Sequence, residues 1–378
     1  MKTEKVKGFN DFIGEEAEKR EAVRKIIVET FEKYGYEPAE TPIIEYEEFV
    51  KGDKEQEGDQ AVRDIFKLED RGKRKLALRY EFTFQLKRIA NGQKLPYKRY
   101  QIGYNFRDEP VREGRLRQFI QCDADIVGST VKDEAENFSV FKEVLEKLEI
   151  RFTIYINNRK LLNEIMEKEK IKNRIEVIRE IDKMDKLGKK EVIQNLKKYS
   201  AEKIINIFDK PEKYFEKYDS YSEIKELKKY CKLFNIDVKF RPFLARGFSY
   251  YNGTVFEVWS DKLNVAICAG GSYIINGIQS TGISFGIEPI MLLANIILNQ
   301  EKYLVVSLAQ DKEAIKLAQK LRSRREIVSI YYGKPSKALE YADSKRYLFV
   351  IFIGEDEIKK KKYKIKDMKS GEEKEEKF

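Results

Sequence analysis

The sequence predicts an α+β protein in which an antiparallel sheet with helices is interrupted by a helical insertion and followed by a small α/β domain. Three observations lead to this fold class. Residues 97–107 and 116–128 are β-prone segments on either side of an arginine-rich loop, as in an antiparallel strand pair. From about 159 to 235 the chain becomes rich in Lys and Glu at helical spacing. From 302 onward, strand-like and helix-like segments alternate.

The N-terminal elements begin with an amphipathic helix. Apolar residues from Ala22 to Phe31 lie close to helical spacing in 15–34, and Gly35 follows as a C-cap glycine would. Pro38 and Pro42 then bracket an extended segment. Further along we expect strands at 64–69, 75–81, 97–107, 116–128 and 151–157, with helices at 83–91 and 133–148.

Strand-like sequence returns after the insertion. It occurs in DVKFRPF (237–243), GTVFEVW (253–259) and LNVAICAGG (263–271), and a helix is expected at 287–299. The C-terminal part reads as a βαβαβ unit, with helices at 311–323 and near 336–342. Its lysine-rich tail is expected to hold one strand and then fray. These patterns predict a first domain at 1–300, carrying the insertion, and a second at 302–378.

Composition sets outer limits on the class of protein. The 378 residues are enough for two or three domains, and 42% hydrophobic with 37% charged residues is typical of a globular chain. No apolar run approaches the ~20 residues of a membrane span, and the N-terminus has no apolar signal region. Three cysteines without zinc-like spacing favour a reducing cytoplasm.

Two features of composition concern partners and catalysis. The formal charge of +10 fits either a Lys-rich proteome bias or a polyanionic partner. Histidine is absent, so no imidazole can act as base or metal ligand, and a catalytic zinc or a Ser-His-Asp triad is excluded. Catalysis would have to use Arg, Lys, Glu, Asp, Tyr or a bound cation.

The loop FRDEPVREGRLRQF (106–119) concentrates guanidinium groups between two predicted strands. Arginine is the planar, bidentate partner of phosphate and carboxylate. Arg107 lies at a strand end, Arg112 and Arg115 lie in a loop able to cover a ligand, and Phe119 could stack on a base. A hairpin with a solvated, Arg-rich turn is the alternative.

The loop and its flanks resemble motif 2 of the class II aminoacyl-tRNA synthetases, in particular the archaeal/eukaryotic form of histidyl-tRNA synthetase. Nearly the whole chain shares the resemblance, with the motifs in the same order. The similar stretches are KRYQIGYNFRDEPVREGRLRQFIQCDADIVG (98–128), LRYEFT (78–83), IYINNRKLL (154–162), LARGFSYYNGTVFEV (244–258), GISFGIE (282–288) and KDMKSGEE (366–373).

The resemblance implies roles around ATP. Arg107 would grip the α-phosphate and the amino-acid carboxylate, and Arg246 would be a second catalytic arginine on the other side. A fixed guanidinium offsets the repulsion between these two anions and stabilises charge building at phosphorus. Glu109 would accept from the adenine amino group and Arg115 would reach the distal phosphates. The implied ATP-binding set is Arg107, Glu109, Arg115, Phe119 and Glu288.

The resemblance also implies a histidine pocket. Glu81, Thr83 and Gln121 would hold the amino end, Asp125 and Tyr251 would face the imidazole, and Tyr250 would line the pocket. An acid and a phenol suit a ring with two polar nitrogens and reject apolar isosteres. The alternative is that these are ordinary core aromatics and strand-edge carboxylates.

The sequence departs from the family pattern at four positions. Pro289 stands where motif 3 normally has an arginine that clamps the nucleotide, and proline supplies neither charge nor donor. Ser272 and Ile274 replace the arginine and aspartate of GGRYDGL, and Ser249 stands where Asp is usual.

The function implied is a histidine–tRNA ligase that uses ATP and Mg²⁺, charges tRNA(His) and forms a cytoplasmic homodimer through a motif 1 near 28–49. The C-terminal domain would read the anticodon. One alternative is a histidine-binding paralogue that regulates another enzyme, like the ATP phosphoribosyltransferase regulatory subunit, and the missing motif 3 arginine favours it. Another is a basic RNA-binding protein that uses only the C-terminal module.

Overall fold

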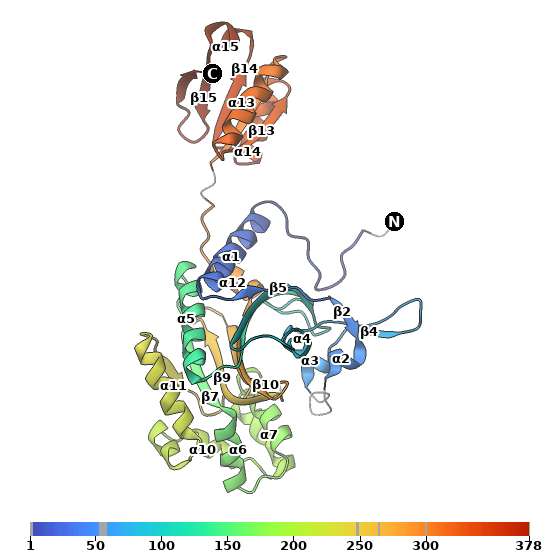
Figure 1. Cartoon of the computed structure of the whole chain (residues 1–378), viewed down its shortest axis with the longest axis vertical. Helices are drawn as coiled ribbons and strands as arrows, with labels where there is room; N and C mark the ends of the chain where they lie inside the picture. The colour runs from blue at the N-terminus through green and yellow to red at the C-terminus, as the bar shows by residue number, and fades with distance from the viewer. Residues whose placement is uncertain (1–2, 53–58, 247–248, 264, 299–300, 378) are drawn as a thin grey trace. The chain divides into compact units, whose positions relative to one another are not determined.

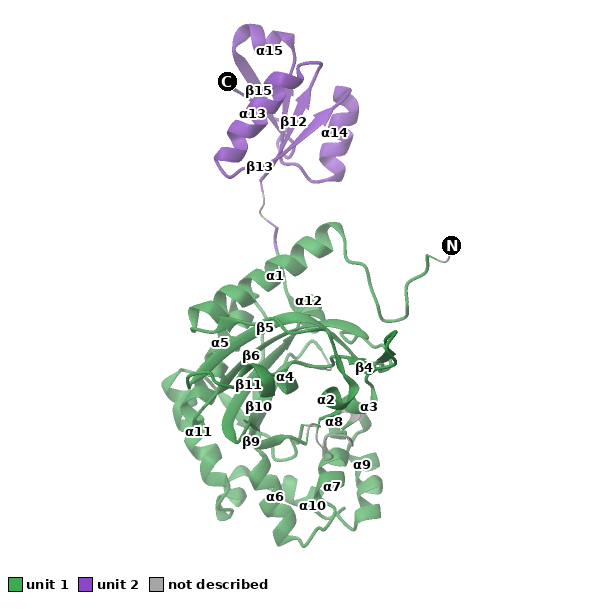
Figure 2. Ribbon diagram, turned by 45° about the vertical axis from the view of Figure 1, so that its right-hand side comes forward, with its two compact units in different colours: residues 1–296 green, residues 297–378 purple. Residues whose placement is uncertain are grey.

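The computed structural model describes residues 3–52, 59–246, 249–263, 265–298 and 301–377. The chain divides into two compact units, residues 1–296 and 297–378, shown in different colours in Figure 2. Each unit has hydrophobic clusters of its own. None of the helices in the described ranges has the length and apolar character needed to cross a bilayer.

The first unit is built on an eight-stranded sheet that is mainly antiparallel, which confirms the predicted fold class (Figure 1). Among the strands in the described residues, only the two outermost pairs, β1 with β5 and β7 with β8, are parallel. In spatial order the strands are β1 (Glu37–Pro38), β5 (Tyr97–Phe106), β6 (Gln118–Val127), β11 (Ile278–Gly286), β10 (Ala266–Ile275), β9 (Tyr251–Trp259), β7 (Thr153–Asn158) and β8 (Val238–Phe240).

Helices α1 (Gly14–Lys33) and α5 (Val131–Lys147) pack on the sheet and bury the largest core. Their apolar sides meet alternate residues of β6, namely Cys122, Ala124 and Ile126. Thr130 and Asp133 form a capping box that begins α5. Because side chains alternate along a strand, the intervening residues of β6 face away from this core.

Helix α12 (Ile287–Leu293) ends earlier than the predicted helix at 287–299, because Ala294 has an extended backbone, with φ −71° and ψ 129°. That part of the prediction was wrong.

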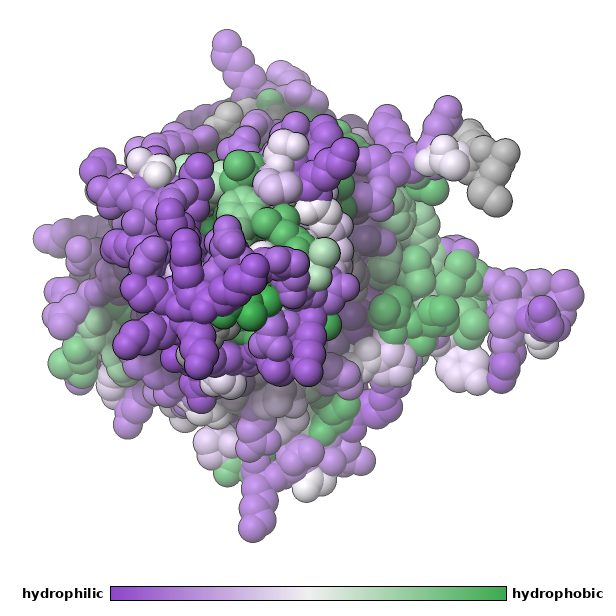
Figure 3. Space-filling view, turned by 90° about the horizontal axis from the view of Figure 1, so that it is seen from above, coloured by the Kyte–Doolittle hydropathy of each residue, from purple (hydrophilic) through white to green (hydrophobic). Residues whose placement is uncertain are grey.

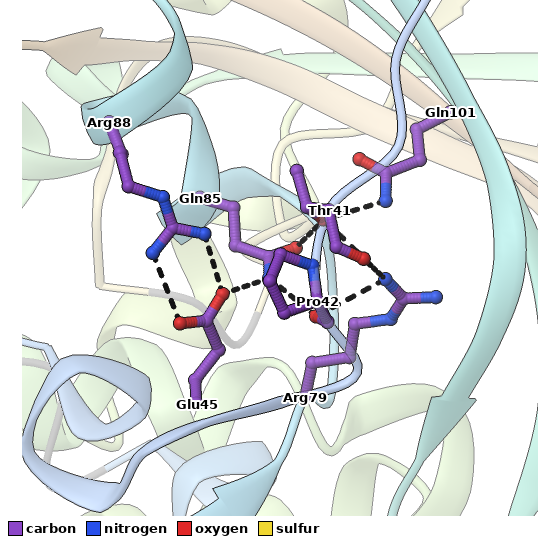
Figure 4. Close-up of polar contacts among 7 residues, drawn as sticks. All are labelled: Thr41, Pro42, Glu45, Arg79, Gln85, Arg88 and Gln101. Carbon is purple, nitrogen blue, oxygen red and sulfur yellow. Dashed lines mark hydrogen bonds and ion pairs between the residues drawn. The ribbon is translucent and has the colours of Figure 1, made fainter.

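A three-stranded sheet lies beside the main one, with order β2 (Ile44–Tyr46), β4 (Lys75–Leu78) and β3 (Lys67–Glu69). Short helices α2 (Glu47–Lys51), α3 (Gln60–Arg63) and α4 (Thr83–Ile89) accompany it. Figure 4 shows the polar network that joins β2 to α4: Arg88 binds both oxygens of Glu45, at 2.7 and 3.0 Å, and Gln85 donates to Glu45 at 2.6 Å.

Arg79, drawn in the same view, anchors the segment that precedes α4. Its guanidinium donates to the carbonyl oxygens of Thr41 at 2.7 Å and Tyr104 at 2.9 Å. Burial lowers the pKa of Arg79 to about 10, which leaves it charged at neutral pH. This network holds residues 79–83 at the edge of the main sheet.

The insertion between β7 and β8 is helical. It contains α6 (Arg159–Lys168), α7 (Arg174–Ile181), α8 (Met184–Leu187), α9 (Lys189–Leu196), α10 (Ile204–Phe208) and α11 (Tyr221–Leu233), together with two 3-10 turns, Lys197–Tyr199 and Glu212–Lys217.

The second unit is a five-stranded sheet of order β13 (Ile327–Tyr332), β12 (Lys302–Ser307), β14 (Phe349–Ile353), β15 (Lys362–Asp367) and β16 (Glu373–Lys377). Strand β12 is parallel to both β13 and β14, so the predicted βαβαβ unit is confirmed. Helices α13 (Asp311–Ser323) and α14 (Pro335–Ser344) pack into two separate clusters, one on each face, and α15 (Glu355–Lys360) follows β14.

The sequence predicted that the tail would fray after one strand, and this prediction was wrong. Strand β16 pairs antiparallel with β15, and opposite charges form diagonal ion pairs across the two strands, as in Lys364–Glu373 at 3.1 Å and Lys362–Glu375 at 3.2 Å. Cross-strand ion pairs of this kind stabilise the β15–β16 hairpin, which has few apolar residues.

Candidate active site

A cavity of about 330 Å³ lies over the face of the main sheet that points away from α1 and α5. It is lined by strands β6, β9, β10 and β11, by the loop after β5 and by the start of α4. Such a volume suits a small-molecule site. Four arginines reach it, Arg107, Arg112, Arg115 and Arg246, together with buried carboxylates.

Strand β6 supplies one wall through its alternating residues. Gln121, Asp123 and Asp125 line the cavity, while Cys122 and Ala124 lie in the core on the other face. Asp123 is not among the predicted residues, although its place midway between Gln121 and Asp125 in a period-two pattern could have found it.

The arginine-rich loop lies beside the cavity on a structured turn. Arg107 follows β5 directly, and its Nε donates to the carbonyl of Tyr80 at 3.2 Å. Backbone hydrogen bonds in both directions pair Arg112 with Arg115 at 3.0 and 3.1 Å, with Gly114 in the left-handed region between them. Because directly paired residues project to the same side, both guanidinium groups reach the cavity.

Two of the predicted ATP-binding residues are not in the cavity lining. Phe119 is half-buried, and its ring lies 5.1 Å from the Arg107 guanidinium. Glu288 is buried in α12, where it accepts from Arg20 of α1 at 2.6 Å and from the backbone N–H of Ile120 at 3.1 Å. The Glu288 carboxylate therefore ties α1, β6 and α12 together.

The residues predicted to hold the amino end of histidine come together. Glu81 and Thr83 lie at the start of α4 and line the cavity with Gln121. The Tyr250 hydroxyl donates to Glu81 at 3.1 Å. The Gln121 amide donates to Ser284 Oγ at 2.7 Å and accepts from Asn105 at 2.7 Å, which fixes its orientation.

Asp125 has a phenol partner that the sequence did not indicate. Tyr273 of β10 donates to the Asp125 carboxylate. Tyr251 lines the same cavity, with its ring 5.9 Å from the Arg246 guanidinium. Tyr273 was not predicted, because only strand register brings β10 to Asp125.

Arg246 occupies a demanding backbone position. Its φ is 54°, in the left-handed region that costs a non-glycine residue of order 1 kcal/mol or more. Its Nη1 donates to Glu257 at 3.1 Å. Gly247 and Phe248 of the same motif lie outside the described residues.

Contacts on both sides of Arg246 hold this conformation. Arg159 donates to the carbonyl of Ala245 at 3.1 Å. On the other side, buried Asp59 accepts from the Ser249 backbone at 2.9 Å and from Arg179 of the insertion at 3.0 Å. Three separate segments therefore preorganise this arginine.

The positions that depart from the family pattern lie outside the cavity lining. The turn at Gly114 packs on Pro289 and Leu292: a Cβ built on Gly114 would lie 3.6 Å from Pro289 Cα. The Ser272 hydroxyl donates a hydrogen bond to buried Glu134, and Ile274 is exposed. Pro289 therefore packs against the arginine-rich turn at Gly114.

Burial shifts the acids of the cavity. Desolvation raises the pKa of Glu81 to about 8, partly offset by the positive charge of Arg107. Desolvation and the nearby charge of Asp125 raise the pKa of Asp123 to about 7, and burial also raises the pKa of Asp125. These acids are placed to pair with a cationic ligand.

The protein is expected to lose stability as the pH rises toward 8. Glu81 has a folded pKa of about 8, above the ordinary value of 4.5, so the folded state binds more protons between these two values; stability is lost as the pH rises through this range and levels off above about 8. The loss is up to about 1.4 kcal/mol per pH unit for each such group. Thermal unfolding between pH 6 and 9 would measure it. Glu81→Gln should flatten the curve, and an unchanged slope would contradict this assignment.

An antiparallel sheet with arginines at a strand end, a helical insertion and a separate C-terminal α/β unit is the arrangement of a class II aminoacyl-tRNA synthetase. A family model described as "Histidyl-tRNA synthetase" matches residues 8–290, and one described as "Anticodon binding domain" matches residues 296–377. The chain belongs to the histidyl-tRNA synthetase family.

Individual relatives are similar to this chain over nearly its full length. A "Histidine--tRNA ligase 1" of Bacillus cereus is 34% identical, covering 99% of this chain and 97% of the relative. A "Histidine--tRNA ligase" of Nanoarchaeum equitans is 33% identical, covering 93% and 91%. The crystal structure of histidyl-tRNA synthetase from Nostoc sp. PCC 7120 has the same fold, with a TM-score of 0.82 at 24% identity, covering 100% and 97%.

Proposed function

We propose that this chain is a histidine–tRNA ligase, an aminoacyl-tRNA ligase that activates histidine with ATP and transfers it to tRNA(His). The observation that carries the proposal is the convergence of four arginines and the buried acids Glu81, Asp123 and Asp125 on one cavity. Adenylate formation requires two anions, the amino-acid carboxylate and the α-phosphate, to be held together beside an ammonium group, and this cavity offers groups of both charges.

In the first step a carboxylate oxygen of histidine attacks the α-phosphorus of ATP and pyrophosphate leaves. Arg107 and Arg246 would hold the carboxylate and the α-phosphate and stabilise the charge on the phosphoryl oxygens. Arg112 and Arg115, on their shared turn, would bind the distal phosphates. Phe119 and Glu109 remain our candidates for the adenine.

The histidine would lie along β6. Its ammonium group would pair with Glu81 and contact Thr83 and Gln121, and its ring would reach Asp125. In the second step a ribose hydroxyl at the 3′ end of the tRNA attacks the activated carbonyl, and AMP leaves.

Mg²⁺ would enter with the triphosphate. No cluster of three or more Cys, Asp or Glu residues suited to a metal occurs among the residues that the structure describes. Mg²⁺ usually keeps several waters and takes one or two carboxylates plus substrate phosphates. Glu109 and Glu257 are among the acids that line the cavity and could supply such a carboxylate, and the ion would neutralise charge on the phosphates.

The second unit would read the tRNA anticodon, as the description of its matching family suggests. The net charge of +10 would favour RNA binding. Full-length similarity, this unit included, argues against the regulatory paralogue. We place the protein in the cytoplasm, where its three buried, free cysteines would stay reduced.

We also propose a homodimer that uses the small three-stranded sheet. Ile44 and Tyr46 of β2 are 50% and 57% exposed, and Ile43 and Leu68 add to the same apolar surface. Figure 3 shows hydrophobic surface on the side where β2 and β4 lie in Figure 1. Exposed apolar patches of this kind mark association sites. A monomeric mass for the wild type in solution, or an unchanged mass for Ile44→Glu, would contradict the proposal.

The test of the catalytic proposal is exchange of labelled pyrophosphate into ATP by the purified full chain. We expect exchange with histidine and none with other amino acids. Absence of exchange, with histidine binding retained, would instead support a regulatory paralogue.

A further inference from the structure

Arg99 of β5 is a charged residue in an unusual place. Its side chain is fully buried, does not line the cavity, and forms an ion pair with Asp125 across 2.9 Å. The Arg99 guanidinium also donates to the Phe82 carbonyl at 3.2 Å, while its Nε and Nη1 have no hydrogen-bond partner among the described residues. Burying a guanidinium with so few partners is costly, so stability alone is a poor explanation.

Strand register directs this charge at Asp125. Arg99 lies directly opposite Asp125 in the β5–β6 pair, and Gly282 lies opposite Asp125 on the other side, in β11. A Cβ on Gly282 would fall 2.2 Å from Asp125 Oδ1 and 2.9 Å from the Tyr273 hydroxyl oxygen. Glycine at this position therefore leaves the space in which acid and phenol meet.

The Asp125 carboxylate is held at both oxygens but is not saturated. Tyr273 donates to Oδ1, and Arg99 approaches Oδ2 as an ion pair rather than an aligned hydrogen bond. Oδ2 accepts no hydrogen bond from the described residues, although Asp125 is almost completely buried. Asp125 lines the cavity, and the hydrogen bond from Tyr273 leaves further acceptor capacity on the carboxylate for a ligand N–H donor.

We propose that Arg99 and Tyr273 are positioning residues for substrate specificity: they hold Asp125 as an oriented anion that accepts the ring N–H of the histidine substrate. This inference rests on the proposed function. Arg99 supplies the charge that keeps the acid ionised in a dry site, and Tyr273 sets the direction of the carboxylate. A ring of similar size without an N–H leaves Asp125 unpaired, and sites of this type reject such analogues strongly.

Amino-acid analogues separate this role from general stabilisation. 2-Thienylalanine has a five-membered aromatic ring without N–H. Histidines methylated at Nδ1 or at Nε2 each block one ring nitrogen. We expect the wild type to reject thienylalanine and to accept only one of the two methylhistidines, since Asp125 addresses a single nitrogen.

The decisive variants are Tyr273→Phe, Arg99→Leu and Arg99→Lys, each assayed by pyrophosphate exchange. Tyr273→Phe should raise KM for histidine by about ten- to hundredfold, the cost of one hydrogen bond to a charged group, with KM for ATP within twofold. Arg99→Leu should reduce the preference for histidine over thienylalanine at least tenfold, and Arg99→Lys should restore part of it. Tyr221→Phe is the matched control, because that buried phenol donates to Glu212 in the insertion, outside the cavity.

The outcomes distinguish this inference from the proposed function. No exchange by the wild type would overturn the function. Wild-type exchange, with unchanged histidine KM and analogue preference in Tyr273→Phe and Arg99→Lys, would overturn the inference. Thermal unfolding identifies a misfolded Arg99→Leu protein, in which case Tyr273→Phe, which changes one oxygen atom, decides.

Discussion

Arg246→Ala is expected to lower histidine-dependent pyrophosphate exchange by about 10²–10³-fold while leaving histidine binding nearly unchanged. One preorganised charge on the transferring phosphoryl group is worth about that much. The histidine contacts that we propose lie on Glu81, Gln121 and Asp125, on other elements. Exchange kinetics with ATP and calorimetric binding of histidine would measure the two quantities separately.

Controls for this prediction lie on the same segment. Arg241 is in the same loop, but it is not a lining residue of the cavity: it stacks on Tyr155 and pairs at 3.4 Å with Asp185, which does line the cavity. Arg241→Ala should retain exchange. Equal loss of exchange and histidine binding in Arg246→Ala would mean that Arg246 supports the fold of the loop rather than the reaction.

Arg20→Met is expected to lower the free energy of unfolding of the first unit by about 3–5 kcal/mol. The Arg20–Glu288 pair is buried, with 8% and 6% of the two side chains exposed, and removing one partner leaves an uncompensated charge. Chemical denaturation followed by circular dichroism would measure the loss.

The double variant Arg20→Met with Glu288→Leu is the matched control. Replacing a whole buried pair by apolar residues is often neutral, so most of the stability should return. A double variant as unstable as the single one would show that Glu288 stabilises the fold mainly through the Ile120 N–H. If Glu288→Gln instead raised KM for ATP strongly without loss of stability, the sequence prediction of an ATP contact would be supported.

Local pattern predicted much of this fold. The β5–β6 pair, helix α1 and the βαβαβ part of the second unit all have periodic apolar residues and turn residues that depend on neighbouring sequence only. The end of α12 and strand β16 were missed, because one depends on where the chain leaves the first unit and the other on charge pairing between strands. Such tertiary effects leave no periodic signal.

In the site, too, some residues could be predicted from local sequence and others depend on tertiary structure. Residues within recognisable motifs, such as Arg107, Gln121 and Asp125, line one cavity. Tyr273 and Arg99 could not be assigned from sequence, because each meets Asp125 only through the register of a different strand. Glu288 illustrates the converse: a motif residue whose side chain is engaged by a distant helix.

The acids of the cavity also couple substrate binding to proton release. Glu81 and Asp123, with pKa values raised to about 8 and 7, carry protons for part of the time at neutral pH. An ammonium group that enters beside Glu81 replaces such a proton as its counter-charge and lowers the pKa. Histidine uptake would therefore release protons to the solvent, so that its affinity rises with pH and its heat of binding depends on the ionisation enthalpy of the buffer.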